Sequence, residues 1–169
     1  MILAQQFGGS CSKFFLGCSF KGEFQGLTIR ITYQPPRKNT PAYLRISLEK
    51  RTRLKLRVYR ESAISRLGEK MGLVREVKTG DEQFDNDFLI FSNNKEQAEI
   101  YLSSFDKKNI VKELFKRGFD ELIMDGKRLL VSKPYSFKND SVEDLSILKV
   151  QEILDILFKL TSGFDSNFK

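Results

Sequence analysis

The sequence contains no histidine and no tryptophan, and its 169 residues include only two cysteines, Cys11 and Cys18. The absence of histidine excludes Ser-His-Asp and Cys-His catalysis and His-ligated metals, and it removes the usual general base near neutral pH. Two cysteines seven residues apart cannot supply the four ligands of a structural zinc site. We therefore expect two buried thiols, with a disulfide as the alternative in an exported protein, and no cofactor.

Long hydrophobic runs are also missing, since no stretch approaches the 18 apolar residues that a membrane-spanning helix needs. The early apolar stretch FFLGCSF is interrupted by glycine and serine and lacks the layout of a signal peptide. A composition of 40% hydrophobic and 30% charged residues is ordinary for a globular protein of one domain. We expect a single cytoplasmic domain, residues 1–169, without a transmembrane segment.

Aspartate is absent from the first 79 residues, which hold 16 Lys and Arg against 5 Glu, a net charge of +11. Residues 80–169 hold 13 Lys and Arg against 17 Asp and Glu, a net charge of −4. A basic strand-rich part, 1–79, is thus joined to a more acidic helix-containing part, 80–169. This asymmetry indicates either an acidic partner or two halves that complement each other.

Alternating apolar and polar residues predict hairpins in the first half of the chain. One hairpin is expected over residues 19–34 with its turn at Gln25-Gly26. Residues 43–61 are too long for one strand, so we expect a second hairpin with its turn at residues 50–52. A short helix over 62–71 and a strand over 73–77 should follow.

The second half predicts more helix. FLIF at 88–91 is typical of a central strand covered on both sides. Asn94 and Asp106 are expected to cap a helix pair, with Phe105 in its apolar stripe. Asp125-Gly126 predicts a type I′ turn, and a last helix should run from a cap at Ser141 to Gly163. The fold class is α+β: an antiparallel-rich sheet built from hairpins, with the helix pair and the long C-terminal helix packed on it.

The stretch TGDEQFDNDFLIF, residues 79–91, concentrates carboxylates, and Asp81, Asp85 and Asp87 are candidate metal ligands. The EF-hand pattern fails, because Asn86 stands where a loop beginning at Asp81 requires glycine. Aspartates before a buried strand more often bond nearby backbone amides. We favour a turn with backbone caps and keep a carboxylate-based, metal-dependent hydrolase as an alternative.

A second candidate site is a basic strand face that follows from continuing the alternation through both hairpins. It collects four arginines, one lysine and two tyrosines: Arg30, Arg45, Arg53, Lys55, Arg57, Tyr43 and Tyr59. Guanidinium groups beside aromatic rings on a sheet are typical of proteins that bind single-stranded nucleic acid. A solvated strand face carries similar residues. The leading hypothesis is a non-enzymatic domain that holds an acidic protein on this face, with nucleic acid as the alternative partner.

In order along the chain, L-A-x-x-F-G, G-E-F-Q-G-L-T-I-R-I and T-G-D-E-Q-F-D-N-D-F resemble a family of uncharacterised bacterial proteins. That family has a domain of unknown function with a tGD-x-x-FD-x-x-F motif, and some members carry membrane segments before it. The resemblance covers most of the chain and implies no activity. It implies that Gly80, Asp81, Phe84, Asp85 and Phe88 form one structural feature.

Overall fold

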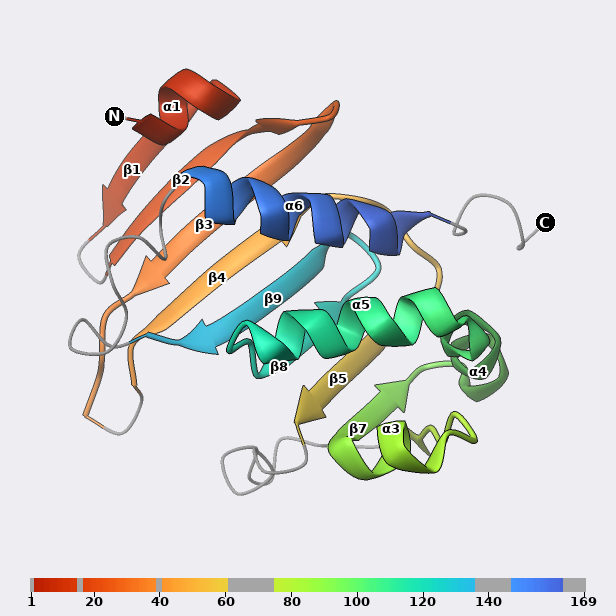
Figure 1. Cartoon of the computed structure of the whole chain (residues 1–169). Coiled ribbons are helices and arrows are strands. Elements are labelled where there is room, and N and C mark those ends of the chain that lie inside the picture. Colours follow the sequence, from red (N-terminus) through yellow and green to blue (C-terminus); the bar gives the residue numbers. More distant parts are fainter. Residues whose placement is uncertain (1, 15–16, 39–40, 61–74, 136–146, 163–169) are drawn as a thin grey trace.

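The computed structural model describes residues 2–14, 17–38, 41–60, 75–135 and 147–162 (Figure 1). Its centre is an antiparallel sheet of nine described strands in the order β1-β2-β3-β4-β9-β8-β5-β7-β6. The strands are β1 (Ser10–Phe14), β2 (Gly17–Phe24), β3 (Leu27–Gln34), β4 (Tyr43–Leu48), β5 (Leu56–Arg60), β6 (Arg75–Glu76), β7 (Phe88–Ser92), β8 (Glu121–Met124) and β9 (Leu129–Pro134). This confirms the α+β class and the antiparallel-rich sheet.

The described helices pack on one face of this sheet, as Figure 1 shows. They are α1 (Ile2–Phe7), α3 (Glu82–Asp87), α4 (Lys95–Ser103), α5 (Phe105–Lys116) and α6 (Ile147–Thr161). Helix α6 contacts β4 and α5, while α3 and α4 contact β7. In the part of the chain that the structure describes, the opposite face of the sheet has no helix on it, and we call it the open face.

The two faces follow from the strand alternation. Across the sheet, Ile31, Ile46, Val131, Leu122, Val58 and Ile90 form one row of paired residues on the helix side. These side chains are at most 5% exposed and belong to one hydrophobic core. The neighbouring row lies on the open face and contains Arg30, Ser47, Leu130, Ile123, Arg57 and Phe91. Burying the first row and the helix residues packed on it is the main stabilisation of the fold.

The predicted hairpin over residues 43–61 is wrong, although both of its strands exist. Strand β4 pairs with β3 and β9, and β5 pairs with β7 and β8. The β8–β9 hairpin, about seventy residues further along the chain, lies between them. The first hairpin is confirmed, with Gln25 and Gly26 both at positive φ in its turn.

The helix pair is confirmed in outline and corrected in detail. The Asn94 side chain accepts a hydrogen bond from the Gln97 amide at 3.1 Å, as expected for its cap. Asp106 is not a cap, because α5 begins at Phe105 and Ser104 occupies the cap position. The helical conformation is interrupted at Ser104, between α4 and α5. Phe105 is 75% exposed and does not lie in the core.

Three further expectations are corrected. Strand β7 is largely buried but lies second from the sheet edge, next to the two-residue β6. The β8–β9 turn is centred on Gly126 and Lys127, because the Asp125 amide donates to the Arg128 carbonyl. Only Gly126 of the two has a positive φ, so the turn is not type I′. Both cysteines are free but exposed, not buried.

Some expectations lie outside the described residues, namely the helix over 62–71, Leu73 and Val74 of the strand over 73–77, the cap at Ser141 and the end at Gly163. Within the described part, α6 presents Val150, Leu154 and Leu157 to the core as predicted, each at 0% exposure. No described helix has the length and apolar character needed to cross a membrane.

Candidate anion-binding surface

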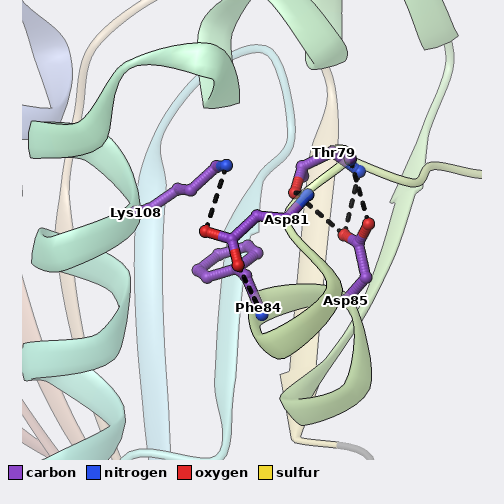
Figure 2. A network of polar contacts seen from close by, with 6 residues as sticks. Thr79, Asp81, Phe84, Asp85 and Lys108 are labelled. Atoms are coloured by element: carbon purple, nitrogen blue, oxygen red, sulfur yellow. Dashed lines mark hydrogen bonds and ion pairs between the residues drawn. The ribbon is translucent and has the colours of Figure 1, made fainter.

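The acidic segment, residues 79–87, is a short capped helix rather than the turn alone that the sequence predicted (Figure 2). Asp81 Oδ1 accepts a hydrogen bond from the Phe84 amide at 3.1 Å and thereby caps α3. Asp85 turns back on the preceding residues. It accepts bonds from the amide and hydroxyl of Thr79, at 2.8 and 2.9 Å, and from the Gly80 amide at 3.0 Å.

Phe84 anchors this segment in the core. It is fully buried, and the centroids of the Phe84 and Phe88 rings lie 4.8 Å apart. The Phe88 ring in turn packs against Phe115 on α5, also with 4.8 Å between the ring centroids. Gly80 has a φ of +80°, a conformation that glycine adopts without strain. One structural feature therefore contains all five residues of the motif: Gly80, Asp81, Phe84, Asp85 and Phe88.

The three candidate metal ligands are used differently. Asp81 also forms an ion pair with Lys108, whose Nζ lies 3.3 Å from Oδ2. The Phe84 amide, and then Lys108, hold the pKa of Asp81 below its ordinary value of 3.8. Asp87 is exposed and lies beside a groove between α3 and α5. Among the described residues, no group of three histidine, cysteine, aspartate or glutamate side chains is arranged to hold a metal ion.

The seven residues of the predicted basic face do not share one surface. Four of them lie on the open face: Arg30, Arg45, Arg57 and Tyr43. Arg45 on β4 and Arg57 on β5 are three inter-strand spacings apart, a distance across the sheet of about 14 Å. Arg45 lies over the Tyr43 ring, with 6.0 Å between the guanidinium carbon and the ring centroid.

Tyr59 is on the open face as well, yet it is only 5% exposed. Burial, and then the neighbouring carboxylate of Glu121, raise the pKa of the Tyr59 hydroxyl above its ordinary value of 10.0. Its ring packs against Phe91, with centroids 6.3 Å apart. Tyr59 is therefore a packing residue and offers no aromatic surface to a partner.

Arg53 and Lys55 belong to a loop, because β5 begins only at Leu56. This loop, residues 49–55, lies at the same end of the sheet as the β2–β3 and β8–β9 turns, since Leu48 pairs with Leu129 and Leu56 with Met124 (Figure 1). We call the 49–55 and 125–128 loops the basic end. It carries six cations: Lys50, Arg51, Arg53, Lys55, Lys127 and Arg128.

The two acids of the basic end are engaged within the protein. The Asp125 carboxylate accepts from the amides of Lys127 and Arg128 and from the Arg128 guanidinium, at 2.9 to 3.0 Å. Burial alone would raise the pKa of Asp125, but these bonds hold it below its usual range. The other acid, Glu49, forms an ion pair in which its Oε1 lies 3.9 Å from a guanidinium nitrogen of Arg30. The basic end thus has an excess of four positive charges.

A groove of about 1000 Å³ runs along this end. Its lining includes Thr28, Arg51, Lys127 and Arg128. Sequence reasoning missed Lys127 and Arg128 because they lie far from residues 49–55 in the chain. The available signal was the D-G-K-R turn, which sends both residues out of the hairpin.

No protein-family model matches this chain, and no curated protein sequence matches it. One solved structure to which it is similar is that of the mycobacterial trehalose monomycolate transport factor A, TtfA. The two are 13% identical, with a TM-score of 0.57 over 86% of this chain and 75% of that one. At this identity the likeness concerns the fold alone.

Proposed function

We propose that this chain is a non-enzymatic interaction domain that binds an acidic protein through its basic end. The observation that carries the proposal is the charge excess there. The cations of these loops exceed the acids by four charges, even though Arg128 pairs with Asp125 and Glu49 lies near Arg30. Five of the six cations are exposed: Arg51, Arg53, Lys55, Lys127 and Arg128. A surface with one dominant sign of charge attracts a partner of the opposite sign and accelerates its association.

The aromatic residues favour an acidic protein over single-stranded nucleic acid. Proteins that bind single strands combine cations with exposed rings on which bases stack. Tyr43 lies at the opposite end of β4 from the basic end, and Tyr59 is buried. The described residues of the basic end include no aromatic side chain. The cations there offer charge and hydrogen-bond donors without a stacking platform.

A charge reversal with a matched control tests this proposal. Arg53→Glu with Lys55→Glu changes the charge of the basic end by four, and Arg37→Glu with Lys38→Glu makes the same change at the opposite end of the sheet. Binding of a labelled polyglutamate peptide, followed by fluorescence anisotropy, should be abolished by the first pair and retained by the second. Equal losses in both variants would mean that only the net charge matters, and the proposal would fail.

A labelled oligothymidine distinguishes the nucleic-acid alternative. For that alternative, log Kobs should fall with log salt by about 0.7 for each phosphate contact, and Tyr43→Ala should weaken binding. We expect Tyr43→Ala to leave binding of both probes unchanged. A large effect of Tyr43→Ala on oligothymidine alone would favour nucleic acid.

One coarser similarity accords with a non-enzymatic role, since the solved structure with a similar fold is named a transport factor. We also propose that the tGD-x-x-FD-x-x-F motif defines relatives of this domain, because its aspartates and phenylalanines maintain a local structure. Phe84→Asp should then prevent folding, as measured by circular dichroism. A folded variant would count against this use of the motif.

A further inference from the structure

The groove between α3 and α5 lies at the sheet end opposite the basic end and is independent of the function proposed above. It has a volume of about 550 Å³, within the usual range for small-molecule sites. Eight residues line it: Arg60, Gln83, Asn86, Asp87, Phe88, Lys112, Phe115 and Lys116. They come from the end of β5, from α3, from the start of β7 and from the last turns of α5.

Three of these residues are cations that the structure leaves without an ion-pair partner in its described part. Lys112 and Lys116 are four residues apart on α5 and therefore lie on the same face of that helix. Arg60 approaches from β5. Asp87 is the one acid among the described lining residues, so the lining carries a net charge of +2.

Aromatic rings hold two of the cations in place. The Arg60 guanidinium donates to the Phe115 carbonyl and lies over the Phe115 ring, 5.8 Å from its centroid. The Lys112 Nζ lies 5.7 Å from the centroid of Phe84. Such contacts lower the cost of ordering long side chains around a ligand. The Arg60 bond also offsets part of the negative potential at the C-terminal end of α5, which would otherwise repel an anion.

Two amides complete the lining. Gln83 and Asn86 are three residues apart on α3 and lie on one face of it, toward the groove. Each side chain offers two N–H donors and one carbonyl acceptor. Amides beside cations suit a ligand that has hydroxyl groups next to its charged group.

From this arrangement, we propose that the α3–α5 groove binds the phosphate group of a phosphate monoester. Such a group carries a charge of about −1.5 to −2 near neutral pH, which matches the net charge of the lining. Its oxygens accept charge-assisted bonds from guanidinium and ammonium groups. The neighbouring amides would contact the hydroxyl-bearing part of the ligand. The monoester can be a soluble molecule or a lipid headgroup, and the recognition chemistry is shared.

The first test titrates the whole protein with glycerol 3-phosphate while recording the side-chain amide signals of Gln83 and Asn86 by NMR. Both signals should shift in a saturable manner. Lys112→Gln with Lys116→Gln should weaken the affinity by about a hundredfold, about tenfold for each lost charge-assisted contact. Lys127→Gln, at the basic end, is the control and should leave the affinity unchanged.

A second arm identifies the source of the phosphate. Vesicles containing phosphatidylinositol 4-phosphate, whose headgroup carries a phosphate monoester beside hydroxyl groups, are compared with vesicles of neutral phosphatidylcholine in a flotation assay. Binding of glycerol 3-phosphate without flotation indicates a soluble ligand, and flotation that is lost with Lys112→Gln and Lys116→Gln indicates a lipid headgroup. Either outcome supports the site.

The proposal is overturned if neither probe binds at millimolar concentration. It is also overturned if Lys127→Gln weakens binding as much as the groove variant does, because the anion would then respond only to overall charge. Circular dichroism of the groove variant checks that it is folded, and Lys116→Gln alone, at an exposed position, gives a second measurement at about a tenfold loss. Failure here leaves the proposed binding of acidic proteins untouched, since that binding uses the other end of the sheet.

Discussion

The acidic segment, residues 79–87, and the basic end both concentrate charge of one sign, but the protein uses them in opposite ways. In the acidic segment, the oxygens of Asp81 and Asp85 accept bonds from nearby amides, a hydroxyl and Lys108. At the basic end, exposed cations outnumber two acids that already have partners. Charge density in the sequence therefore does not by itself mark a site. What distinguishes the two regions is that Asp81 and Asp85 make the contacts that cap and hold α3, whereas the basic end keeps an excess of four positive charges.

The largest effect is expected at the anchor of the acidic segment. Phe84 is fully buried against Phe88, so Phe84→Ala should lower the free energy of unfolding by about 3–5 kcal/mol. Chemical denaturation measures this change. Phe105→Ala is the matched control, because Phe105 is 75% exposed, and it should change stability by less than about 0.5 kcal/mol. Similar values for the two variants would contradict the structural role of the segment.

The next largest effect on stability should distinguish the carboxylate of Asp85 from that of Asp87. Asp85→Ala leaves the amides of Thr79 and Gly80 without their acceptor and should cost about 1–3 kcal/mol of unfolding free energy. Asp87→Ala removes an exposed carboxylate and should cost less than about 0.5 kcal/mol. The same denaturation experiment measures both. If Asp87→Ala proved the more damaging, the division of roles within the segment would be wrong.

Low pH should weaken the acidic segment, because protonation of Asp81 removes the cap of α3. The folded-state pKa of Asp81 is lowered, so its contribution to stability is present above the ordinary value of 3.8 and is lost as pH falls through the folded-state pKa. Melting temperatures recorded between pH 5 and pH 2 should therefore fall more steeply for the native chain than for Asp81→Asn. Parallel curves would show that the Asp81 cap contributes no pH dependence.

Removing one cation of the basic end should hardly affect folding. Arg51 is exposed and lines the groove at that end, so Arg51→Gln should change the unfolding free energy by less than about 0.5 kcal/mol while weakening the binding of polyglutamate. A loss of more than about 1 kcal/mol would mean that Arg51 is structural, as the aspartates are.

The smallest expected effect is that of added metal ions. Asp81 and Asp85 already accept hydrogen bonds, so millimolar magnesium, manganese or calcium should leave the melting temperature unchanged. A clear rise with one of these ions, abolished by Asp85→Asn, would revive the metal-dependent alternative.

Local patterns in the sequence predicted the features that local interactions determine. The turn at Gln25-Gly26, the cap at Asn94 and the α+β class were all predicted. The partners of β4 and β5 were not, because the β8–β9 hairpin that separates them lies about seventy residues further along the chain. No local periodicity encodes such an insertion.

The positions of the residues in the predicted basic face were also predicted only where local strand geometry determines them. Arg30, Arg45 and Arg57 lie on the open face because strand alternation places them there. Arg53 and Lys55 do not lie on the open face, because they belong to the loop between the end of β4 at Leu48 and the start of β5 at Leu56. The contribution of Lys127 and Arg128 depends on the β8–β9 turn lying beside the 49–55 loop, which only the three-dimensional structure shows.

The most direct test of the account maps where an acidic polypeptide touches the protein. Backbone amide signals are recorded by NMR while polyglutamate is added. We predict shifts at residues 50–55 and 126–128, with little change at Arg37 and Lys38 at the other end of the sheet. Shifts centred on Arg37 and Lys38, or spread evenly over all exposed cations, would contradict the assignment of the basic end as the binding surface.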